Sequence, residues 1–343
     1  MLKSRRFWIG ITISAAFLAL FFWQVDFSEM GRALARANYI YLIPALAVYY
    51  LGVWFRALRW RYLLLPLGKF SILYLFRLVT IGFALNDILP ARLGIILRAY
   101  LLGEKEKVSK VAVFATVGVE RIFDGLALIL MLIVASSFVS LLEGDVTYWV
   151  EIIKWVSVGI FLLALFGLLF ITYKPDLIRK IGKALIRHLP SRSKLKWGEW
   201  LDAAIIGLSL PRNKARLLAV SATSLLVWVC EGSTFYFLSI GFNIGQPYHA
   251  MLLVMCIATL SWVSLISPGG LGTYDWFGQQ ALIALRVVKE QASAFMLAVH
   301  AAQMLPIIAL GFIFLWMEGL SFGKVIGKKV RLTEETESGG SEQ

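Results

Sequence analysis

Charged residues are scarce in this sequence. Only 16% of the 343 residues are Asp, Glu, Lys or Arg, whereas 59% are hydrophobic and the mean hydropathy is +0.76. A soluble globular chain with this composition would have too few polar side chains to cover its surface. The composition therefore excludes a soluble protein and predicts an integral membrane protein.

Cysteine is scarce as well, and common catalytic motifs are missing. The two cysteines, Cys230 and Cys256, both lie within apolar runs. A disulfide framework is therefore not expected and a metal site has no support; we expect both thiols to be buried. The sequence contains no D-x-D, H-E-x-x-H, Walker or G-x-S-x-G motif, which are typical of metal, nucleotide or hydrolase chemistry. No cofactor is expected.

Basic residues outnumber acidic ones by 34 to 21, which gives a net charge of +13. They lie in short segments between apolar runs and form no recognition face for nucleic acid. The positive-inside rule places basic segments in the cytoplasm, and these are residues 1–6, 56–69, 98–110, 174–216 and 321–331. The chain is thus predicted to cross the cytoplasmic (inner) membrane several times with both termini inside.

The segment 174–216 is the largest predicted cytoplasmic piece, with eleven Lys and Arg against three acids. Leu, Ile and Trp interleaved with these cations predict one or two amphipathic helices on the membrane surface. Anionic phospholipids are the expected partners there. Segments 26–38 and 143–147 are neutral or acidic and are expected as outer loops. The tail 321–343 is predicted to be disordered.

Apolar runs long enough to cross a membrane occur six times. A helix needs about 20 residues to cross a hydrocarbon core of ~30 Å. The runs are residues 7–25, 39–55, 111–142, 149–173, 217–241 and 293–318. The first run lacks a small-residue cleavage site, so we interpret it as a retained anchor.

Two further apolar regions, 71–102 and 250–289, are interrupted by a similar phrase. Pro90-Ala91-Arg92-Leu93-Gly94 recurs as Pro268-Gly269-Gly270-Leu271-Gly272, 178 residues later. Each region is predicted to be a re-entrant helical hairpin, since both flanks of each lie on one side of the membrane. Residues 39–142 and 217–320 then share one plan in opposite orientations, an inverted repeat. The fold class is an all-α membrane protein with about six spans and two re-entrant hairpins in one domain, 1–320.

The two breaks predict a site for an anion. Helices that restart at about Leu93 and Thr273 would direct free amides and a partial positive charge toward the membrane interior. Glycines near those amides would allow a ligand to approach. The predicted substrate-binding residues are Arg92, Arg98, Gly94, Gly269, Gly270, Gly272, Asn86 and Asp87. The alternative is that both loops serve packing only.

Several further charged or polar residues lie within apolar runs. Each charge exposed to lipid at a helix centre costs roughly 2.5 to 3.5 kcal/mol, so these groups must be paired, neutralised or hydrated. The predicted transport-path or proton-coupling residues are Glu120, Arg121, Asp124, Glu231, Asp275 and His300.

Two interpretations of the acidic pair remain open. Arg121 and Asp124 could form a structural pair at i and i+3. Alternatively, Glu120 and Asp124 share a helix face, need a cation such as Arg92, and couple transport to protons. His300 lies 180 residues after Glu120, which suggests equivalent positions in the two repeats; the alternative is a hydrogen-bonded packing residue.

An ordered set of residues resembles the flippase-like family, the membrane domain of lysylphosphatidylglycerol synthase/flippases and of stand-alone relatives. The set is Arg56, Arg59-Trp60, Asn86 to Leu89, Pro90 to Gly94, Arg98, Glu120-Arg121, Asp124, Pro268 to Gly272 and His300. The resemblance covers about residues 10 to 320 and implies movement of lipids between leaflets. The chain departs from the family at Ile95 and Asp275, where Glu is common. The soluble aminoacyltransferase domain of two-domain members is not expected.

The sequence thus favours a flippase for an anionic phospholipid or a polyprenyl-phosphate-linked lipid, and not an enzyme. The alternatives are a transferase acting on a lipid-linked substrate and a scaffold of an envelope-synthesis complex. A homo-oligomer or an envelope-synthesis partner are further hypotheses.

Overall fold

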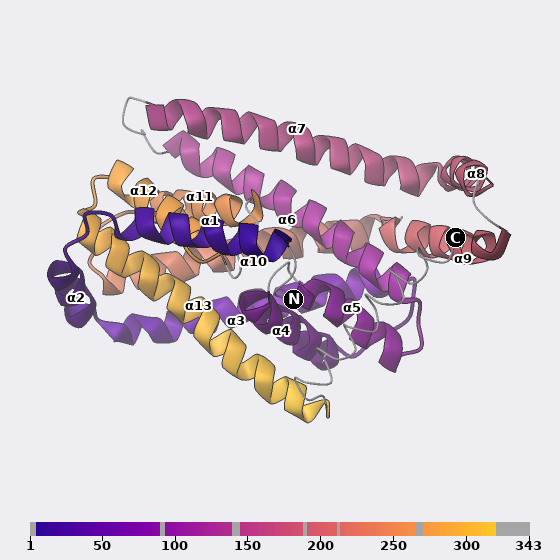
Figure 1. The fold of residues 1–343 in the computed structure, drawn as a ribbon, viewed down its shortest axis with the longest axis horizontal. Helices are drawn as coiled ribbons and strands as arrows, with labels where there is room; N and C mark the ends of the chain where they lie inside the picture. Colours follow the sequence, from indigo (N-terminus) through magenta and orange to yellow (C-terminus); the bar gives the residue numbers. More distant parts are fainter. Residues whose placement is uncertain are drawn as a thin grey trace.

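The computed structural model describes residues 5–89, 93–138, 145–187, 191–210, 213–264 and 270–319. These residues form an elongated all-helical bundle in which most long helices run along the same direction (Figure 1). The helices are α1 (Arg5–Phe22), α2 (Phe27–Arg36), η1 (Tyr39–Tyr41), α3 (Leu42–Leu64), α4 (Ile72–Ile88), α5 (Leu93–Lys105), α6 (Lys110–Phe138), α7 (Asp145–Tyr173), α8 (Pro175–Ile186), α9 (Ser191–Leu208), α10 (Lys214–Gly241), α11 (Tyr248–Ser264), α12 (Thr273–Ala284) and α13 (Lys289–Met317).

Three of the described helical segments are long and apolar enough to cross a membrane. They are Tyr39–Leu64, Lys214–Gly241 and Lys289–Met317. Two bent pairs, α1 with α2 at 85° and α7 with α8 at 96°, raise the number to five if each pair counts as one span. The predicted class, a multi-pass helical membrane protein, is confirmed.

Four shorter helices form two hairpins. At 17, 13, 17 and 12 residues, α4, α5, α11 and α12 are all below the about 20 residues that a membrane crossing needs. In hairpin 1 (α4 and α5), Gly82 contacts Gly94; in hairpin 2 (α11 and α12), Ser261 Oγ donates to the Thr273 carbonyl at 3.3 Å. The predicted breaks are confirmed, because α4 ends at Ile88 and α12 begins at Thr273. The tips 90–92 and 265–269, with Arg92 and Gly269, lie outside the described residues.

Helix contacts in the first half of the chain recur in the second half. Helix α3 packs on α4 and α10 packs on α11; hairpin helices α5 and α12 pack on the following long helices α6 and α13. Each hairpin also crosses to the other half, with α4 on α13 and α11 on α6, and α3 lies along α10 in the middle. The apolar core of the described residues forms three clusters, one around Trp60 and Leu75, one around Phe235 and Phe295, and a smaller one around Val119 and Val220.

Two sequence-based expectations are wrong. Segment 26–38, expected as a loop, contains α2, which begins because Asp26 accepts hydrogen bonds from Ser28 N and Glu29 N at 2.8 and 3.1 Å; such a cap satisfies free amides of a first turn. Its buried residue Met30 attaches it to the core. Segment 56–69 was expected to begin a cytoplasmic loop, but α3 continues to Leu64 and buries Arg56 and Arg59.

Other expectations agree with the structure. The segment 174–216 contains two helices, α8 and α9, joined by a hydrogen bond from Arg179 Nε to Asp202 Oδ1 at 2.8 Å. Both cysteines are buried and unbonded to each other. The tail 321–343 lies outside the described residues, so its predicted disorder stays a prediction.

Candidate functional site

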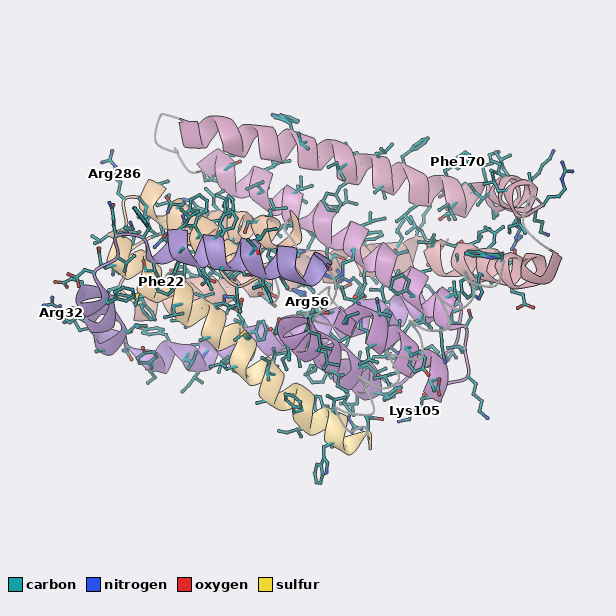
Figure 2. The ribbon with its side chains drawn as sticks, viewed as in Figure 1. Phe22, Arg32, Arg56, Lys105, Phe170 and Arg286 are labelled. Atoms are coloured by element: carbon teal, nitrogen blue, oxygen red, sulfur yellow. The ribbon has the colours of Figure 1, made fainter. Side chains whose placement is uncertain are left out.

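A cavity of about 300 Å³ lies where the two halves of the bundle meet. Its wall takes residues from α3, α4, α5 and α6 of the first half and from α10, α11, α12 and α13 of the second, with one residue, Phe161, from α7. Figure 2 shows Arg56, which lines it, near the middle of the molecule, while Arg32 and Arg286 lie at the left end and Lys105 at the lower edge. The cavity is therefore internal to the bundle.

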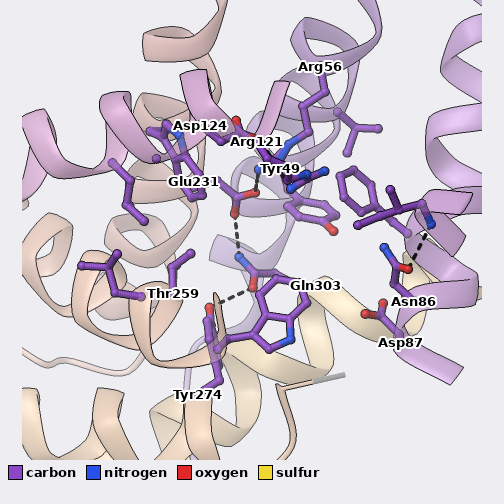
Figure 3. Close-up of a pocket in the computed structure, with 18 of the residues that line it drawn as sticks. Tyr49, Arg56, Asn86, Asp87, Arg121, Asp124, Glu231, Thr259, Tyr274 and Gln303 are labelled. Atoms are coloured by element: carbon purple, nitrogen blue, oxygen red, sulfur yellow. Dashed lines mark hydrogen bonds and ion pairs between the residues drawn. The ribbon is translucent and has the colours of Figure 1, made fainter. Parts of the chain in front are cut away.

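One wall of the cavity is a continuous chain of polar groups (Figure 3). Arg56 Nη2 of α3 donates to Glu231 Oε1 of α10 at 2.6 Å. Gln303 Nε2 of α13 donates to Glu231 Oε2 at 2.9 Å, and the Tyr274 hydroxyl of α12 donates to Gln303 Oε1 at 3.0 Å. The Arg56 guanidinium lies 5.2 Å and 5.4 Å from the ring centroids of Phe83 and Trp228. Both oxygens of Glu231 are thus occupied, and Arg56 is held in place.

A second group of charges centres on the fully buried Arg59, and two of its members, Arg121 and Asp124, also line the cavity. Its Nη1 donates to Asp124 Oδ1 at 2.6 Å and to Ser224 Oγ at 3.0 Å, and its Nη2 donates to Glu120 Oε1 at 3.1 Å. Arg121 Nη1 lies 3.4 Å from Asp124 Oδ2, and its side chain is 40% exposed. The partner cation shared by Glu120 and Asp124 is therefore Arg59.

Arg98 of hairpin 1 joins the same group. It donates to Glu120 Oε2, and its guanidinium lies 4.7 Å from the centroid of the Trp60 ring. The Trp60 indole N–H donates to Thr116 Oγ1 at 3.0 Å. Because Arg98 and Glu120 are buried and do not line the cavity, Arg98 lies behind the wall and not at its surface. This pair attaches α5 to α6.

Hairpin 2 is attached to its next helix by an acid and a histidine. Asp275 Oδ2 accepts from the Gly272 amide at 2.9 Å, and Asp275 Oδ1 lies 2.7 Å from His300 Nδ1 of α13. The His300 ring packs against Tyr274 with centroids 5.3 Å apart. Asp275 thus caps the first turn of α12 and binds α13 at the same time.

The helix starts at both breaks are already capped by protein groups. Asn86 Oδ1 accepts from the Ile95 amide at 3.3 Å in hairpin 1, as Asp275 does from the Gly272 amide in hairpin 2. The described glycines allow close packing. A Cβ at Gly94 would overlap the Gly82 carbonyl, and Gly270 and Gly272 have φ of +77° and +85°. Glycine is required there for backbone contact and backbone conformation, and the role in ligand approach stays a prediction.

The structure brings most of the predicted site residues together. Those that line the cavity are Asn86, Asp87, Arg121, Asp124, Glu231 and His300. Arg98, Glu120 and Asp275 lie behind it and bind its wall. Arg92 and Gly269 lie outside the described residues, so the predicted contact between Arg92 and the acidic pair is not described.

Sequence reasoning missed Arg56, Arg59 and Gln303 as site residues. The signal was present, because Arg56 and Arg59 lie within 26 residues of helical, mostly apolar sequence, Tyr39–Leu64, and a buried arginine demands a partner as much as Glu120 does. An apolar run that ends at residue 55 places both arginines in a loop, whereas α3 continues to Leu64. Among the described residues, no group of three or more His, Cys, Asp and Glu could hold a metal ion.

Fold and site define a polytopic helical membrane protein with a charged internal cavity. The chain belongs to the family described as the lysylphosphatidylglycerol synthase TM region, whose profile matches residues 7–311. This membership agrees with the resemblance found from the ordered motifs, since the matched region contains all of them.

Curated relatives are distant. The UPF0104 membrane protein of Methanothermobacter thermautotrophicus is 24% identical over 78% of this chain and 81% of its own length. The UPF0104 membrane protein PH1989 of Pyrococcus horikoshii is 25% identical over 83% and 88%. Glycosyltransferase AglD of Haloferax volcanii is 26% identical over 78% of this chain but only 47% of its own length, so the chain spans about half of that relative. No solved structure shows significant similarity.

Proposed function

We propose that this protein moves an anionic, phosphate-bearing membrane lipid, or a polyprenyl-phosphate-linked lipid, between leaflets by alternating access at a site near the bilayer midplane. The observation that carries the proposal is the charged cavity between the two halves of the bundle. Its wall includes Arg121, whose side chain is 40% exposed, next to the buried ion pairs of Arg56 and Arg59. Intramembrane charges that line a cavity are typical of substrate pathways.

The architecture supports this mechanism. We propose six membrane-spanning helices (α1, α3, α6, α7, α10 and α13) and two re-entrant hairpins, arranged as an inverted repeat over about residues 39–142 and 217–320. The paired helix contacts and the matching positions of the hairpin contacts, Gly82 to Gly94 and Ser261 to Thr273, support the repeat. In such transporters one repeat moves against the other around a central site.

The proposed setting is the cytoplasmic membrane with both termini inside. The basic helices α8 and α9 would then lie on the inner leaflet, where anionic phospholipids are favourable partners. Exposed apolar side chains on α8, Leu177, Ile181 and Leu185, share one face at i, i+4 and i+8 and suit that surface. Homo-oligomers and partners in envelope synthesis are compatible with this placement.

The test is reconstitution into liposomes that contain a fluorescent phosphatidylglycerol in both leaflets. The protein should speed exchange between leaflets, and Arg121→Gln should slow it at least about tenfold if one charged contact to the phosphate is lost. Arg179→Gln, on the cytoplasmic helix α8, is the matched control with unchanged exchange. No acceleration with phosphatidylglycerol or a polyprenyl phosphate would contradict the proposal.

A second candidate function has one supporting observation, the name of a relative, glycosyltransferase AglD. A transferase would form a new covalent lipid species from a lipid-linked donor. Mass spectrometry of the proteoliposome lipids after incubation with polyprenyl-phosphate sugars distinguishes the two functions. A transporter leaves every lipid mass unchanged.

A further inference from the structure

Asp87 differs from the other acidic residues of the cavity wall. Glu231 is paired with Arg56, and Asp124 is paired with Arg59 and Arg121. No hydrogen bond or ion pair reaches Asp87 from any described residue, and Figure 3 shows it beside Asn86 with no bonded partner. A carboxylate that stays unpaired within a membrane protein is costly, so Asp87 must bind a cation, bind a proton or face water.

The position of Asp87 in its helix disfavours the charged form. It is the second-last residue of α4, which ends at Ile88. The last carbonyls of a helix give that end a partial negative charge, which repels a carboxylate. Asp275 has the opposite placement, since it lies in the first turn of α12 and accepts the Gly272 amide. Of Asp87 and Asp275, Asp87 is therefore the one that helix geometry favours in the protonated form.

The cations around Asp87 are engaged elsewhere. On the elements packed against α4, Arg56 of α3 binds Glu231, Arg98 of α5 binds Glu120, and Lys105 of α5 binds Glu318 beyond the end of α13. Across the cavity, Arg121 of α6 lies beside Asp124.

His300 of α13 is the remaining described basic group near Asp87. It lines the same cavity as Asp87, and its Nδ1 lies 2.7 Å from Asp275 Oδ1. The other titratable groups of the cavity wall are Tyr49, Asp124, Glu231 and Tyr274. The cavity thus places a carboxyl group of hairpin 1 opposite an imidazole that is attached to hairpin 2.

We propose that Asp87 binds and releases a proton in each transport cycle and so couples lipid movement to the transmembrane proton gradient. The carboxylate takes up one proton from the side to which the cavity is open, and the neutral carboxyl group then allows the cavity to close. After the opposite side opens, the proton leaves and the carboxylate is hydrated again. This inference adds an energy source to the proposed function and rests on it.

The test imposes a gradient of about one pH unit across proteoliposomes that contain fluorescent phosphatidylglycerol. With one proton per lipid, the wild type should concentrate the probe in one leaflet up to about tenfold, and reversing the gradient should reverse the direction. Asp87→Asn should leave the two leaflets equally labelled under either gradient. Asp87→Glu, which keeps a carboxyl group, should restore accumulation. Glu104→Gln, an exposed acid of the same hairpin, should behave as the wild type.

A second measurement is independent of transport. Infrared difference spectra between about pH 6 and about pH 9, a range in which ordinary exposed carboxyl groups stay charged, should show a protonated-carboxyl band in the reconstituted wild type and in Glu104→Gln, and Asp87→Asn should lack it. Exchange without accumulation, or a band that persists in Asp87→Asn, overturns the inference and leaves the flippase proposal intact. If the wild type shows the band but moves no lipid, the result contradicts the flippase proposal and not the binding of a proton by Asp87.

Arg92, whose contacts are not described, provides a further check. If Arg92→Gln and Asp87→Asn each abolish accumulation and the double variant regains it, the two residues form a structural ion pair. That result would overturn the role of Asp87 as a proton carrier.

Discussion

Both hairpins bind the long helix that follows them through a charged side chain, but the charge on the hairpin has the opposite sign in the two cases. Hairpin 1 contributes a base, Arg98, that binds an acid of the next long helix, Glu120. Hairpin 2 contributes an acid, Asp275, that binds a base of its next long helix, His300. Glu120 and His300 are 180 positions apart, close to the 178 that separate Gly94 from Gly272. Each hairpin is therefore attached to the following long helix by an acid and a base. In hairpin 1 the base is on the hairpin, and in hairpin 2 the acid is on the hairpin.

The largest effect is expected when the charge pair of hairpin 1 is broken. Glu120→Gln removes the anion that Arg98 binds and one of the two that Arg59 binds, which leaves a buried cation uncompensated. Loss of one partner of a buried pair costs about 3 to 5 kcal/mol. Chemical denaturation of the purified protein should show this loss in the free energy of unfolding.

A double-mutant cycle tests the cause. Arg98→Gln with Glu120→Gln should be less destabilised than the sum of the single variants, because no unpaired charge remains between them. If Glu120→Gln keeps full stability and instead loses the pH dependence of transport, Glu120 is the proton-coupling group and not a structural partner.

A smaller effect is expected from overpacking within hairpin 1. Gly94→Ala places a Cβ against the Gly82 backbone carbonyl, which must move α4 and α5 apart. Overpacking of this kind costs roughly 1 to 3 kcal/mol. The control is Gly31→Ala in α2, where no atom lies within 4 Å of the added Cβ. Melting temperatures in one detergent should fall for Gly94→Ala and not for Gly31→Ala.

Substitution in the Asp275–His300 pair of hairpin 2 should lower the stability less than substitution in the Arg98–Glu120 pair of hairpin 1. His300→Leu leaves Asp275 with the Gly272 amide as its remaining described partner, at a cost of about 1 to 3 kcal/mol. His300→Gln can still donate to Asp275 and should recover part of that loss. Thermal denaturation of both variants and of Glu120→Gln compares the contributions of the two pairs to stability. A larger loss of stability in His300→Leu than in Glu120→Gln would contradict the expected order.

The smallest effect is expected at the exposed end of hairpin 1. Lys105, whose side chain is 55% exposed, binds Glu318 Oε2 at 2.7 Å, and Arg77 Nη1 lies 3.5 Å from the other oxygen of Glu318. Exposed pairs contribute about 0 to 1 kcal/mol. Lys105→Ala should therefore change the melting temperature little, and the same measurement at high salt should reduce the difference further.

Most helices were predictable from sequence because apolar run length and helix breakers are local signals. The runs that became α6, α7, α10 and α13 and the breaks before Leu93 and Thr273 all follow from them. Helix α2 is not evident from the sequence, because its segment mixes apolar and charged residues and its start depends on one side chain, Asp26. The end of α3 was misjudged because buried arginines look like loop residues until their acidic partners are known.

The site was predictable in its members but not in its pairings. Polar residues within apolar runs identified Glu120, Asp124, Glu231 and His300 as a set. Which cation meets which acid depends on how α3 crosses α6 and α10, and this crossing brings Arg59 to Asp124 and Arg56 to Glu231. No spacing along the chain encodes those contacts, since the partners are 65 and 175 residues apart.

Gly272 gives the N-terminal helix a part in the second hairpin. A Cβ at this position would lie 2.6 Å from the Ser14 carbonyl and 2.8 Å from the Leu18 amide, so the backbone of α1 rests directly on the first turn of α12. Helix α1 precedes both hairpins in the chain, and yet its backbone packs against hairpin 2. A fusion tag or truncation that moves α1 along its axis would therefore disturb hairpin 2, which contributes Tyr274 to the cavity wall.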